Sequence, residues 1–320
     1  VYKKTCGHGT IALYLGKRDF VDHVDFVYLA CAFRYGSDDL DVIGLSFRRD
    51  IWMKKVQVYP AADGNPTKTP MQESLLKKVG EQGCPFSFQM PTDLPCSVSL
   101  HPGPNDNGKA CGVDFEVKAY IAKEASNPDE VIDKDTCRLM IRKIQFAPTN
   151  KAGPKVELSK QFMMSDKPIH MEASLEKEIY YHGDPITVIL KVNNETSKTI
   201  KKIKVSVDQL TSVVLYSSDT YTKEVCCEEF ENIAANSTFE KSYQVTPLLS
   251  NNKEKRGLAV DGKLKDEDTN LASTTEKEMQ GIIIHYKVKV TVSTSGGLLG
   301  GLTGDVVVEL PLTLMSPKPA

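Results

Sequence analysis

The sequence has no long run of apolar residues and no excess of charge of one sign. Its longest uninterrupted apolar segment, Phe26–Phe33, is far shorter than the roughly 18 residues of a membrane-spanning helix and is typical of a buried strand. The opening residues, with Lys3 and Lys4, do not form the apolar core of a signal peptide. The 40 Lys and Arg residues balance 42 Asp and Glu residues, for a net charge of −2. This balance argues against a protein that binds nucleic acid through a generally basic surface.

Motifs of enzymes and metal sites are also missing. The eight cysteines and six histidines are dispersed, without a CxxC pair or an HxxxH spacing. This favours the reduced thiols of a cytosolic protein over a disulfide framework or a zinc site. The motifs GxSxG, GxxxxGK(S/T) and HExxH do not occur. We therefore expect neither an enzyme nor a resident cofactor.

Two local features have a plain interpretation and a sharper alternative. The Gly-rich stretch Gly296–Gly304 lacks the Lys-Ser/Thr pair of a phosphate loop, so we interpret it as a turn between strands. The adjacent Cys226 and Cys227 are interpreted as thiols at a strand edge. A redox-active pair is the alternative for these two cysteines.

What the sequence does contain is alternation of apolar and polar residues. Strands that bury one face and expose the other show this period of two, as in antiparallel sandwiches. The pattern recurs in five segments, 113–121, 186–192, 203–207, 282–292 and 306–314. We therefore expect an all-β protein built from antiparallel, immunoglobulin-like β-sandwiches.

One segment shows helical spacing instead. Met71, Leu75 and Val79 form an apolar stripe at i, i+4 and i+8. Residues typical of helix ends surround the stripe: Thr69 as N-cap, Pro70 at the first position, Gln72 completing a capping box, Lys77 and Lys78 in the last turn, and Gly80 as terminator. The sequence predicts one short amphipathic helix.

The length of 320 residues suggests about two domains. The segment 147–160 lacks periodicity and holds Pro148, Gly153 and Pro154. We expect a linker there, with one sandwich over residues 1–146 and a second over 161–320.

Charged residues on one predicted strand are unusual. In a strand, Arg138, Met140 and Arg142 share one face, and a guanidinium on a partly apolar face requires carboxylate partners. Three acidic residues are considered as partners, Asp19, Asp261 and Asp268. From the spacing alone, ordinary surface salt bridges are the favoured interpretation.

Eight blocks of sequence closely resemble the arrestins, both in their residues and in their order along the chain. They are 14–19, 31–36, 44–48, 108–114, 164–168, 177–183, 261–265 and 268–273. The block 213–219 is most similar to the visual branch, of rod or cone type. The resemblance implies two β-sandwiches joined by a short hinge, with one helix in the first. It also implies a protein that binds activated, phosphorylated G-protein-coupled receptors, here an opsin, and blocks G-protein coupling without being an enzyme.

The resemblance also implies roles for particular residues. Arg142 matches a phosphate-sensing arginine in a buried polar core, held by Asp19, Asp261 and Asp268, with residues 253–280 as the polar-core loop. The matching phosphate contacts are Lys3, Lys4, Arg18, Lys78 and Lys265, with Arg138 and Lys143 as further candidates. An inositol polyphosphate is a second ligand consistent with such a site.

Three further regions match functional parts of the family. A finger loop that enters the receptor comprises Tyr35, Asp38, Asp39, Leu40, Asp41, Ile43, Gly44 and Leu45, although a plain hairpin fits the same residues. Met71, Leu75 and Val79 match the helix face that packs on the first strand near Val1 and Tyr2. Leu298 and Leu299 match an apolar loop tip at the bilayer surface, or form a turn tucked into the core.

The chain departs from the family pattern in places. It is shorter after Asp25 and over 274–281, lacks a C-terminal tail beyond Ala320, and has Asp266 where histidine is common. The expected location is the cytoplasm of photoreceptor cells, with recruitment to receptor membranes; self-association is left open. The alternatives are a cargo adaptor of the wider superfamily, which senses no phosphate, and a β-sandwich enzyme.

Overall fold

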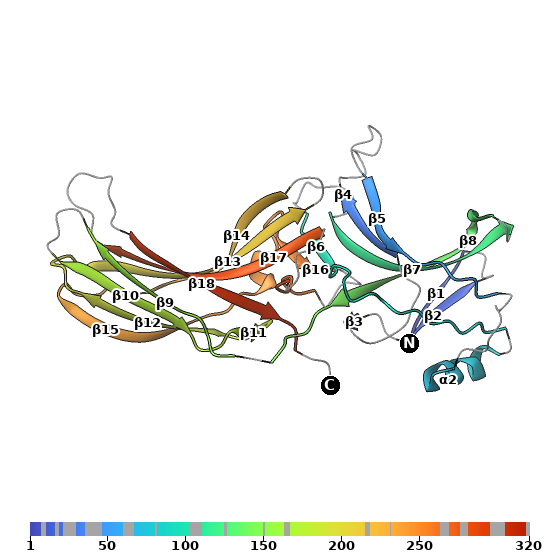
Figure 1. Cartoon of the computed structure of the whole chain (residues 1–320), viewed down its shortest axis with the longest axis horizontal. Coiled ribbons are helices and arrows are strands. Elements are labelled where there is room, and N and C mark those ends of the chain that lie inside the picture. Colours follow the sequence, from blue (N-terminus) through green and yellow to red (C-terminus); the bar gives the residue numbers. More distant parts are fainter. Residues whose placement is uncertain are drawn as a thin grey trace. The chain divides into compact units, whose positions relative to one another are not determined.

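The computed structural model describes residues 1–7, 11–16, 19–21, 30–35, 47–59, 67–80, 82–102, 111–124, 127–149, 151–162, 167–214, 218–230, 232–262, 269–275, 281–294 and 305–317. The chain forms two compact units (Figure 1). The first unit comprises Val1–Leu100, Asn105–Gln145 and Asp261–Thr269; the second comprises His101–Pro104, Phe146–Val260 and Asn270–Ala320. Each unit therefore takes a segment from the other unit's stretch of sequence.

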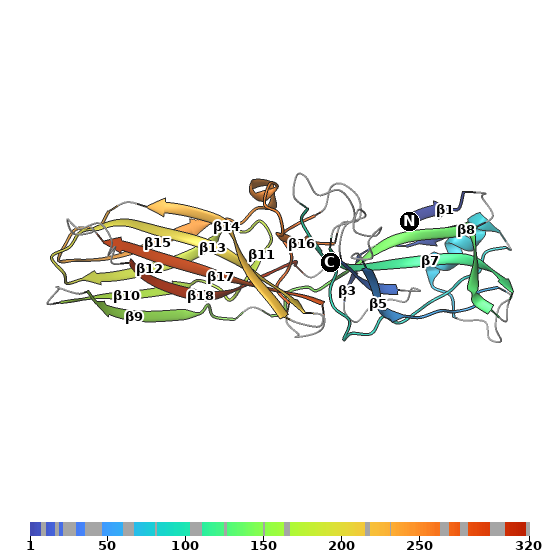
Figure 2. The ribbon, with the colours of Figure 1, turned by 90° about the horizontal axis from the view of Figure 1, so that it is seen from above.

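The second unit is a sandwich of two sheets (Figures 1 and 2). One sheet has the order β15 (Ser237–Val245), β12 (Ile186–Asn194), β10 (Pro168–Leu175) and β9 (Lys155–Gln161). The other has the order β11 (Ile179–Tyr181), β18 (Asp305–Met315), β17 (Gly281–Thr294), β13 (Ile200–Val214) and β14 (Ser218–Phe230). A short 3-10 helix, η1 (Leu249–Asn252), and β16 (Ala259–Asp261) follow β15 in the chain.

The core of the second unit follows the predicted alternation. The alternate positions 186–192, 203–207, 282–292 and 306–314, taken every second residue, form the predicted apolar faces, and each of these side chains is no more than 4% exposed. Strand β9 packs across the sandwich on β18. Burial of one face per strand is what brings the two sheets together.

The first unit has a sheet in which β6 (Val98–Leu100), β7 (Gly112–Glu124), β4 (Ala30–Tyr35) and β5 (Phe47–Met53) are neighbours in that order. Strand β8 (Asn127–Ile144) pairs with β7 and with β3 (Asp19–Val21), and β1 (Tyr2–Thr5) pairs with β2 (Ala12–Leu15). The mostly β architecture is confirmed, with one short α-helix in the part of the chain that the structure describes. Most of the strands pair antiparallel, whereas β3 runs parallel to β8 and β11 parallel to β18.

The predicted helix is present as α2 (Pro70–Val79), with its predicted ends. The Thr69 hydroxyl accepts from the Gln72 backbone N–H at 3.2 Å, and the Gln72 side-chain oxygen accepts from the Thr69 N–H at 2.8 Å. Gly80 ends the helix at a φ of 86°, which glycine adopts without strain.

The apolar stripe of α2 is not buried on the first strand as expected. Met71 and Val79 are 49% and 42% exposed, and Val1 is 67% exposed. The helix instead contacts the end of β2, where the Met71 sulfur lies so close to Gly16 that a Cβ there would be 2.5 Å away. A small residue at position 16 is what allows this approach.

Part of the segment predicted as a linker, 147–160, forms a strand. The boundary between the units falls at Gln145 and Phe146, but Lys155–Gln161 forms β9 of the second unit. The strand escaped prediction because only Val156 and Leu158 are apolar in it, and Leu158 is itself 37% exposed. An edge strand with a weak apolar face gives little periodic signal.

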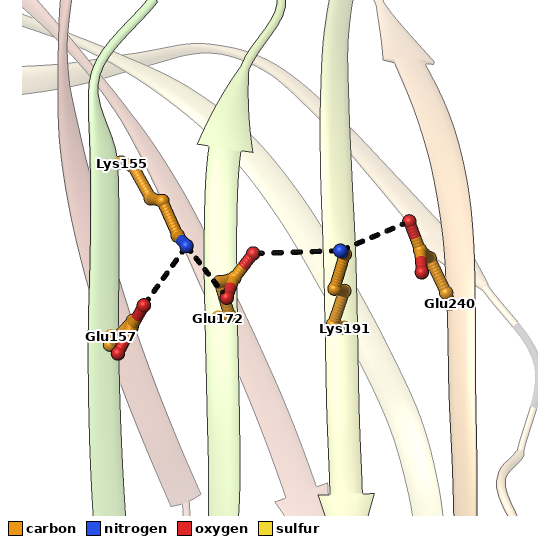
Figure 3. A network of polar contacts seen from close by, with 5 residues as sticks. All are labelled: Lys155, Glu157, Glu172, Lys191 and Glu240. Atoms are coloured by element: carbon orange, nitrogen blue, oxygen red, sulfur yellow. Dashed lines mark ion pairs between the residues drawn. The ribbon is translucent and has the colours of Figure 1, made fainter.

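A chain of ion pairs crosses the outer face of the four-stranded sheet (Figure 3). Lys155 contacts Glu157 at 3.0 Å and Glu172 at 2.9 Å, and Lys191 contacts Glu172 at 3.9 Å and Glu240 at 3.4 Å. The bond from Lys155 holds the pKa of Glu172 below its ordinary value. Exposed pairs add little stability, but charges along the edge strands β9 and β15 oppose pairing with foreign strands.

The cysteines with described side chains are all free thiols, and the described residues contain no cluster of metal-ligating side chains. Cys226 and Cys227 lie on β14, an edge strand, as predicted. Burial raises the pKa of both thiols, that of Cys226 to about 12. Within the described residues no helix has the length and apolar character of a membrane span.

His182 lies in the turn after β11, with its Nε2 3.0 Å from the Ser273 hydroxyl. Burial lowers the pKa of this histidine to about 4. In the unfolded chain the pKa is about 6.5, so protons bind the unfolded state more tightly. The stability that comes from a neutral His182 is therefore fully present above pH 6.5 and is lost as the pH falls toward 4.

We predict that His182→Gln flattens the pH dependence of stability. The free energy of unfolding of the wild-type chain should fall by up to about 1.4 kcal/mol per pH unit between pH 6.5 and 4 because of this one group. Urea unfolding at pH 7.5, 6.0 and 5.0 measures the slope. His285→Gln, at an exposed histidine of β17, is the control. Equal slopes for wild type and His182→Gln would contradict the assignment.

Candidate functional site

Arg142 is a buried cation on β8. Its residue is 8% exposed, whereas Arg138 on the same strand face is exposed and Met140 between them is half-buried. The face of β8 thus passes from solvent into the interior along its length. A guanidinium at the buried end needs charge compensation from its neighbours.

Asp19 is adjacent to Arg142 in the sheet. Strands β3 and β8 pair in parallel, and their register sets Asp19 opposite Arg142. A three-residue strand in parallel pairing thus brings together two positions that are far apart in sequence. The register thus makes the backbone of a predicted partner residue the neighbour of the predicted sensor arginine.

Asp261 reaches the same region from the end of β16. It is 7% exposed, and both Asp261 and Arg142 take part in polar or charged interactions. The next residue, Gly262, packs on the stem of the arginine, since a Cβ at this position would lie 3.5 Å from Arg142 Cγ and 2.7 Å from Ser97 Cβ. Gly262 N–H also donates to the Ser97 carbonyl at 3.4 Å.

The three residues Asp19, Arg142 and Asp261 are called the arginine cluster below. Asp268, the fourth residue expected there, lies outside the described residues, as do Arg18 and Lys265. Ser97 joins the cluster to β8, because its N–H donates to the Lys143 carbonyl at 3.0 Å and its hydroxyl accepts from Lys143 N–H at 2.9 Å. Sequence analysis missed Ser97 and Gly262, and no local pattern distinguishes either residue.

Lys143 is not a phosphate contact, which corrects the expectation. It is 1% exposed, and its ammonium donates to the carbonyls of Leu94 at 2.6 Å and Thr92 at 3.5 Å. Because side chains alternate along a strand, Lys143 points away from the face of Arg142. The alternation rule applied to β8 could have excluded it.

The other predicted phosphate contacts that the structure describes are accessible to solvent. Lys3 and Lys4 lie on β1, and Lys78 lies in the last turn of α2, all exposed to solvent. The Lys3 ammonium is 5.3 Å from the centroid of the Tyr14 ring, a cation–π distance. These side chains can bind an anion from solution without a conformational change of the protein.

The two expected loops are seen only at their ends. Tyr35 and Phe47 are register partners that close the β4–β5 pair, so the segment between them connects two antiparallel strands. Its residues Asp38, Asp39, Leu40, Asp41, Ile43, Gly44 and Leu45 lie outside the described residues. Leu298 and Leu299, between β17 and β18, also lie outside them.

The close packing of Gly262 generates a prediction. Gly262→Ala should destabilise the first unit by about 1–3 kcal/mol, because the new methyl group would lie 2.7 Å from Ser97 Cβ and must displace that residue. Thermal unfolding measures the effect. Gly7→Ala is the control, since no atom lies within 4 Å of a Cβ at position 7. Equal melting temperatures for the two variants would show that the segment is not packed on Ser97.

Comparison with known proteins identifies relatives over the whole chain. The model of the family "Arrestin (or S-antigen), N-terminal domain" matches residues 12–147, and that of "Arrestin (or S-antigen), C-terminal domain" matches residues 165–319. Similar proteins include Arrestin-C of Aquarana catesbeiana at 54% identity, of Sus scrofa at 53% and of Homo sapiens at 51%. Each comparison covers 100% of this chain and 90% of the relative.

The alignment with the Aquarana protein spans 352 positions against the 320 residues of this chain, a difference of 32. The chain is therefore shorter than this relative within the aligned region, in line with the two short stretches noted in the sequence. Family models that match both halves and identities above one half over the full chain leave no ambiguity. The chain belongs to the arrestin family.

Proposed function

We propose that this protein binds activated, phosphorylated opsins and ends their signalling by blocking the G protein. The observation that carries the proposal is the buried Arg142, at a position where Asp19 and Asp261 are its neighbours. The Arrestin-C relatives are visual arrestins of the cone type, so a cone opsin is the proposed receptor. Arrestins are binding proteins and not enzymes.

The arginine cluster can act as an anion sensor because its charges are exchangeable. A receptor phosphate carries about −1.5 to −2 charges and three acceptor oxygens. It competes with the carboxylates of Asp19 and Asp261 for the guanidinium, which can bind phosphate through two parallel hydrogen bonds. Once Arg142 binds the phosphate, the buried carboxylate of Asp261 loses its compensating charge, and the segment that bears Asp261 is released.

The phosphates first meet the accessible cations Lys3, Lys4 and Lys78, with Arg138 at the exposed end of the same β8 face as Arg142. Receptor engagement by the finger loop is the second signal. Two signals together shift the population toward the binding-competent state, whereas either one alone shifts it less. An inositol polyphosphate supplies the same phosphate chemistry in solution and is a proposed competitor.

The protein works in the cytoplasm of photoreceptor cells and is recruited to receptor membranes. Leu298 and Leu299 are the proposed contact with the bilayer surface. Self-association would compete with recruitment if it covers the same cations. A sorting adaptor without phosphate sensing is the alternative function, but such an adaptor has no use for a buried arginine among carboxylates.

The test of the proposal is charge reversal at Arg142. Arg142→Glu places a negative charge among carboxylates and opens the cluster without phosphate. Binding to light-activated, unphosphorylated opsin should rise by about fivefold, which corresponds to about 1 kcal/mol. Co-sedimentation with photoreceptor membranes measures binding, and thermal melting verifies folding.

Arg138→Glu is the matched control, because it reverses charge on the same strand face at an exposed position. It should reduce binding to the phosphorylated opsin and leave binding to the unphosphorylated opsin unchanged. A folded Arg142→Glu protein that binds the unphosphorylated opsin no better than wild type would rule out the sensor.

A second prediction concerns phosphate capture. The double variant Lys3→Ala, Lys4→Ala should weaken binding to phosphorylated opsin about tenfold at physiological salt and leave the melting temperature unchanged. Isothermal titration with a soluble phosphorylated receptor tail measures affinity. Lys54→Ala, Lys55→Ala is the control, an exposed pair in the same unit whose first lysine also faces an aromatic ring, 5.9 Å from the Phe88 centroid. Equal losses in both double variants would mean that only net charge matters.

A further inference from the structure

A closed ring of hydrogen bonds lies in the core of the second unit. The Gln209 side chain on β13 binds both backbone groups of Ala259: its amide donates to the Ala259 carbonyl at 2.8 Å, and its oxygen accepts from the Ala259 N–H at 2.8 Å. The same amide donates to the Tyr286 hydroxyl at 2.8 Å. That hydroxyl donates to the Ala272 carbonyl at 2.5 Å, and the Ala272 N–H donates to the Ala259 carbonyl at 3.0 Å.

All members of the ring are shielded from water. Gln209, Ala259 and Ala272 are 0% exposed and Tyr286 is 3% exposed. Gln209 and Tyr286 are register partners on β13 and β17, which fixes their distance. Hydrogen bonds in such an environment are strong, and loss of one partner leaves a buried polar group unsatisfied.

The ring lies where the inward row of β13 changes from apolar to polar residues. On β13 the inward positions run from Val205 and Val207 to Gln209 and Thr211, and each is 0% exposed. Apolar residues would complete this core more simply, since a buried amide must be compensated fully. The change from valine to glutamine occurs where β13 meets the segments around Ala259 and Ala272.

Those two segments are the ends of one loop. Residue 259 lies two positions before Asp261 of the arginine cluster, and 272 lies on the returning strand, where Leu271 pairs with Val260 in an antiparallel bridge. Further bonds fix the returning end: Thr274 N–H donates to the Leu314 carbonyl at 2.8 Å, and Leu314 N–H donates to the Thr274 hydroxyl at 3.0 Å. The ring thus holds both ends of the loop in register.

We propose that Gln209 and Tyr286 are positioning residues that present Asp261 to Arg142 and so set how readily the arginine cluster opens. The inference rests on the proposed sensor function of that cluster. Neither side chain belongs to the unit that contains Arg142. Both therefore act through the backbone of Ala259, which leads to Asp261 two residues later. A loop whose ends are loosened loses the orientation of its carboxylate before any phosphate arrives.

Two variants test the proposal in the full chain. Tyr286→Phe removes one hydroxyl and its two hydrogen bonds, and Gln209→Leu removes all three bonds of the amide group with Ala259 and Tyr286. Both variants should raise binding to light-activated, unphosphorylated opsin in membranes, by about threefold for Tyr286→Phe and about fivefold for Gln209→Leu. Binding to phosphorylated, activated opsin should change by less than about twofold, because phosphate opens the cluster in any case.

Tyr243→Phe and Gln244→Leu are the matched controls. Tyr243 is a buried tyrosine of β15 that stacks on Phe230, and Gln244 is an exposed glutamine of the same strand. Neither control should change either binding measurement. Hydrogen exchange provides a direct readout: the amides of Ala259 and Ala272 should exchange about tenfold faster in the two test variants and at the wild-type rate in the controls.

The outcomes separate this inference from the function on which it rests. If Arg142→Glu raises binding to unphosphorylated opsin while folded Tyr286→Phe and Gln209→Leu do not, the sensor stands and the positioning role is wrong. If Arg142→Glu also has no effect, the sensor itself fails. Equal losses of binding to both receptor forms would assign Gln209 and Tyr286 a merely structural role and overturn the proposal. Tyr286→Phe, the milder change, decides the question should Gln209→Leu fail to fold.

Discussion

Two buried cations stand next to each other on β8, and the protein neutralises them in opposite ways. Lys143 is held by carbonyl oxygens of one nearby turn, with no group able to leave. Arg142 lies where segments around residues 19, 97 and 261 converge. A charge held by one short segment is permanent, whereas a charge whose surroundings come from distant segments can be uncovered by moving one of them. Signalling requires the second kind, and the remaining architecture brings those segments together.

The sheets themselves need little beyond burial. The rows of valine, isoleucine and leucine in β12, β13, β17 and β18 specify which face of each strand is inside, and a period of two is legible without structural information. The helix could be predicted equally well, since the residues that define its ends are neighbours in sequence. These elements were predicted because the forces that define them are local.

Other features could not be read from the sequence, because they depend on pairing between distant residues. The parallel pairing of β3 with β8 sets Asp19 beside Arg142, yet the three residues of β3 carry no periodic signal. The strand pattern called for carboxylate partners of Arg142, but the choice of the arginine cluster over ordinary surface salt bridges came from the family resemblance. Ser97, Gly262 and the ring around Gln209 were missed altogether, since serine, glycine and glutamine are common in loops and on surfaces. Lys143 is an error of another kind, because the sequence allowed a better prediction. It was predicted to bind phosphate together with Arg142, although adjacent residues of a strand point to opposite faces.

The exchange of segments between the units has a consequence for how the protein is made. The first unit lacks Asp261 until 119 further residues beyond Arg142 have been synthesised, since the segment Asp261–Thr269 comes from the middle of the second unit's sequence. At ribosomal rates of about 5–20 residues per second, this delay is on the order of 6–24 s. During that interval the nascent first unit can form its sheet, but its arginine lacks one of its neighbours. The surroundings of the arginine are therefore completed only when the chain returns across Ser97, and no nascent chain that ends before residue 261 can hold Arg142 in its completed surroundings.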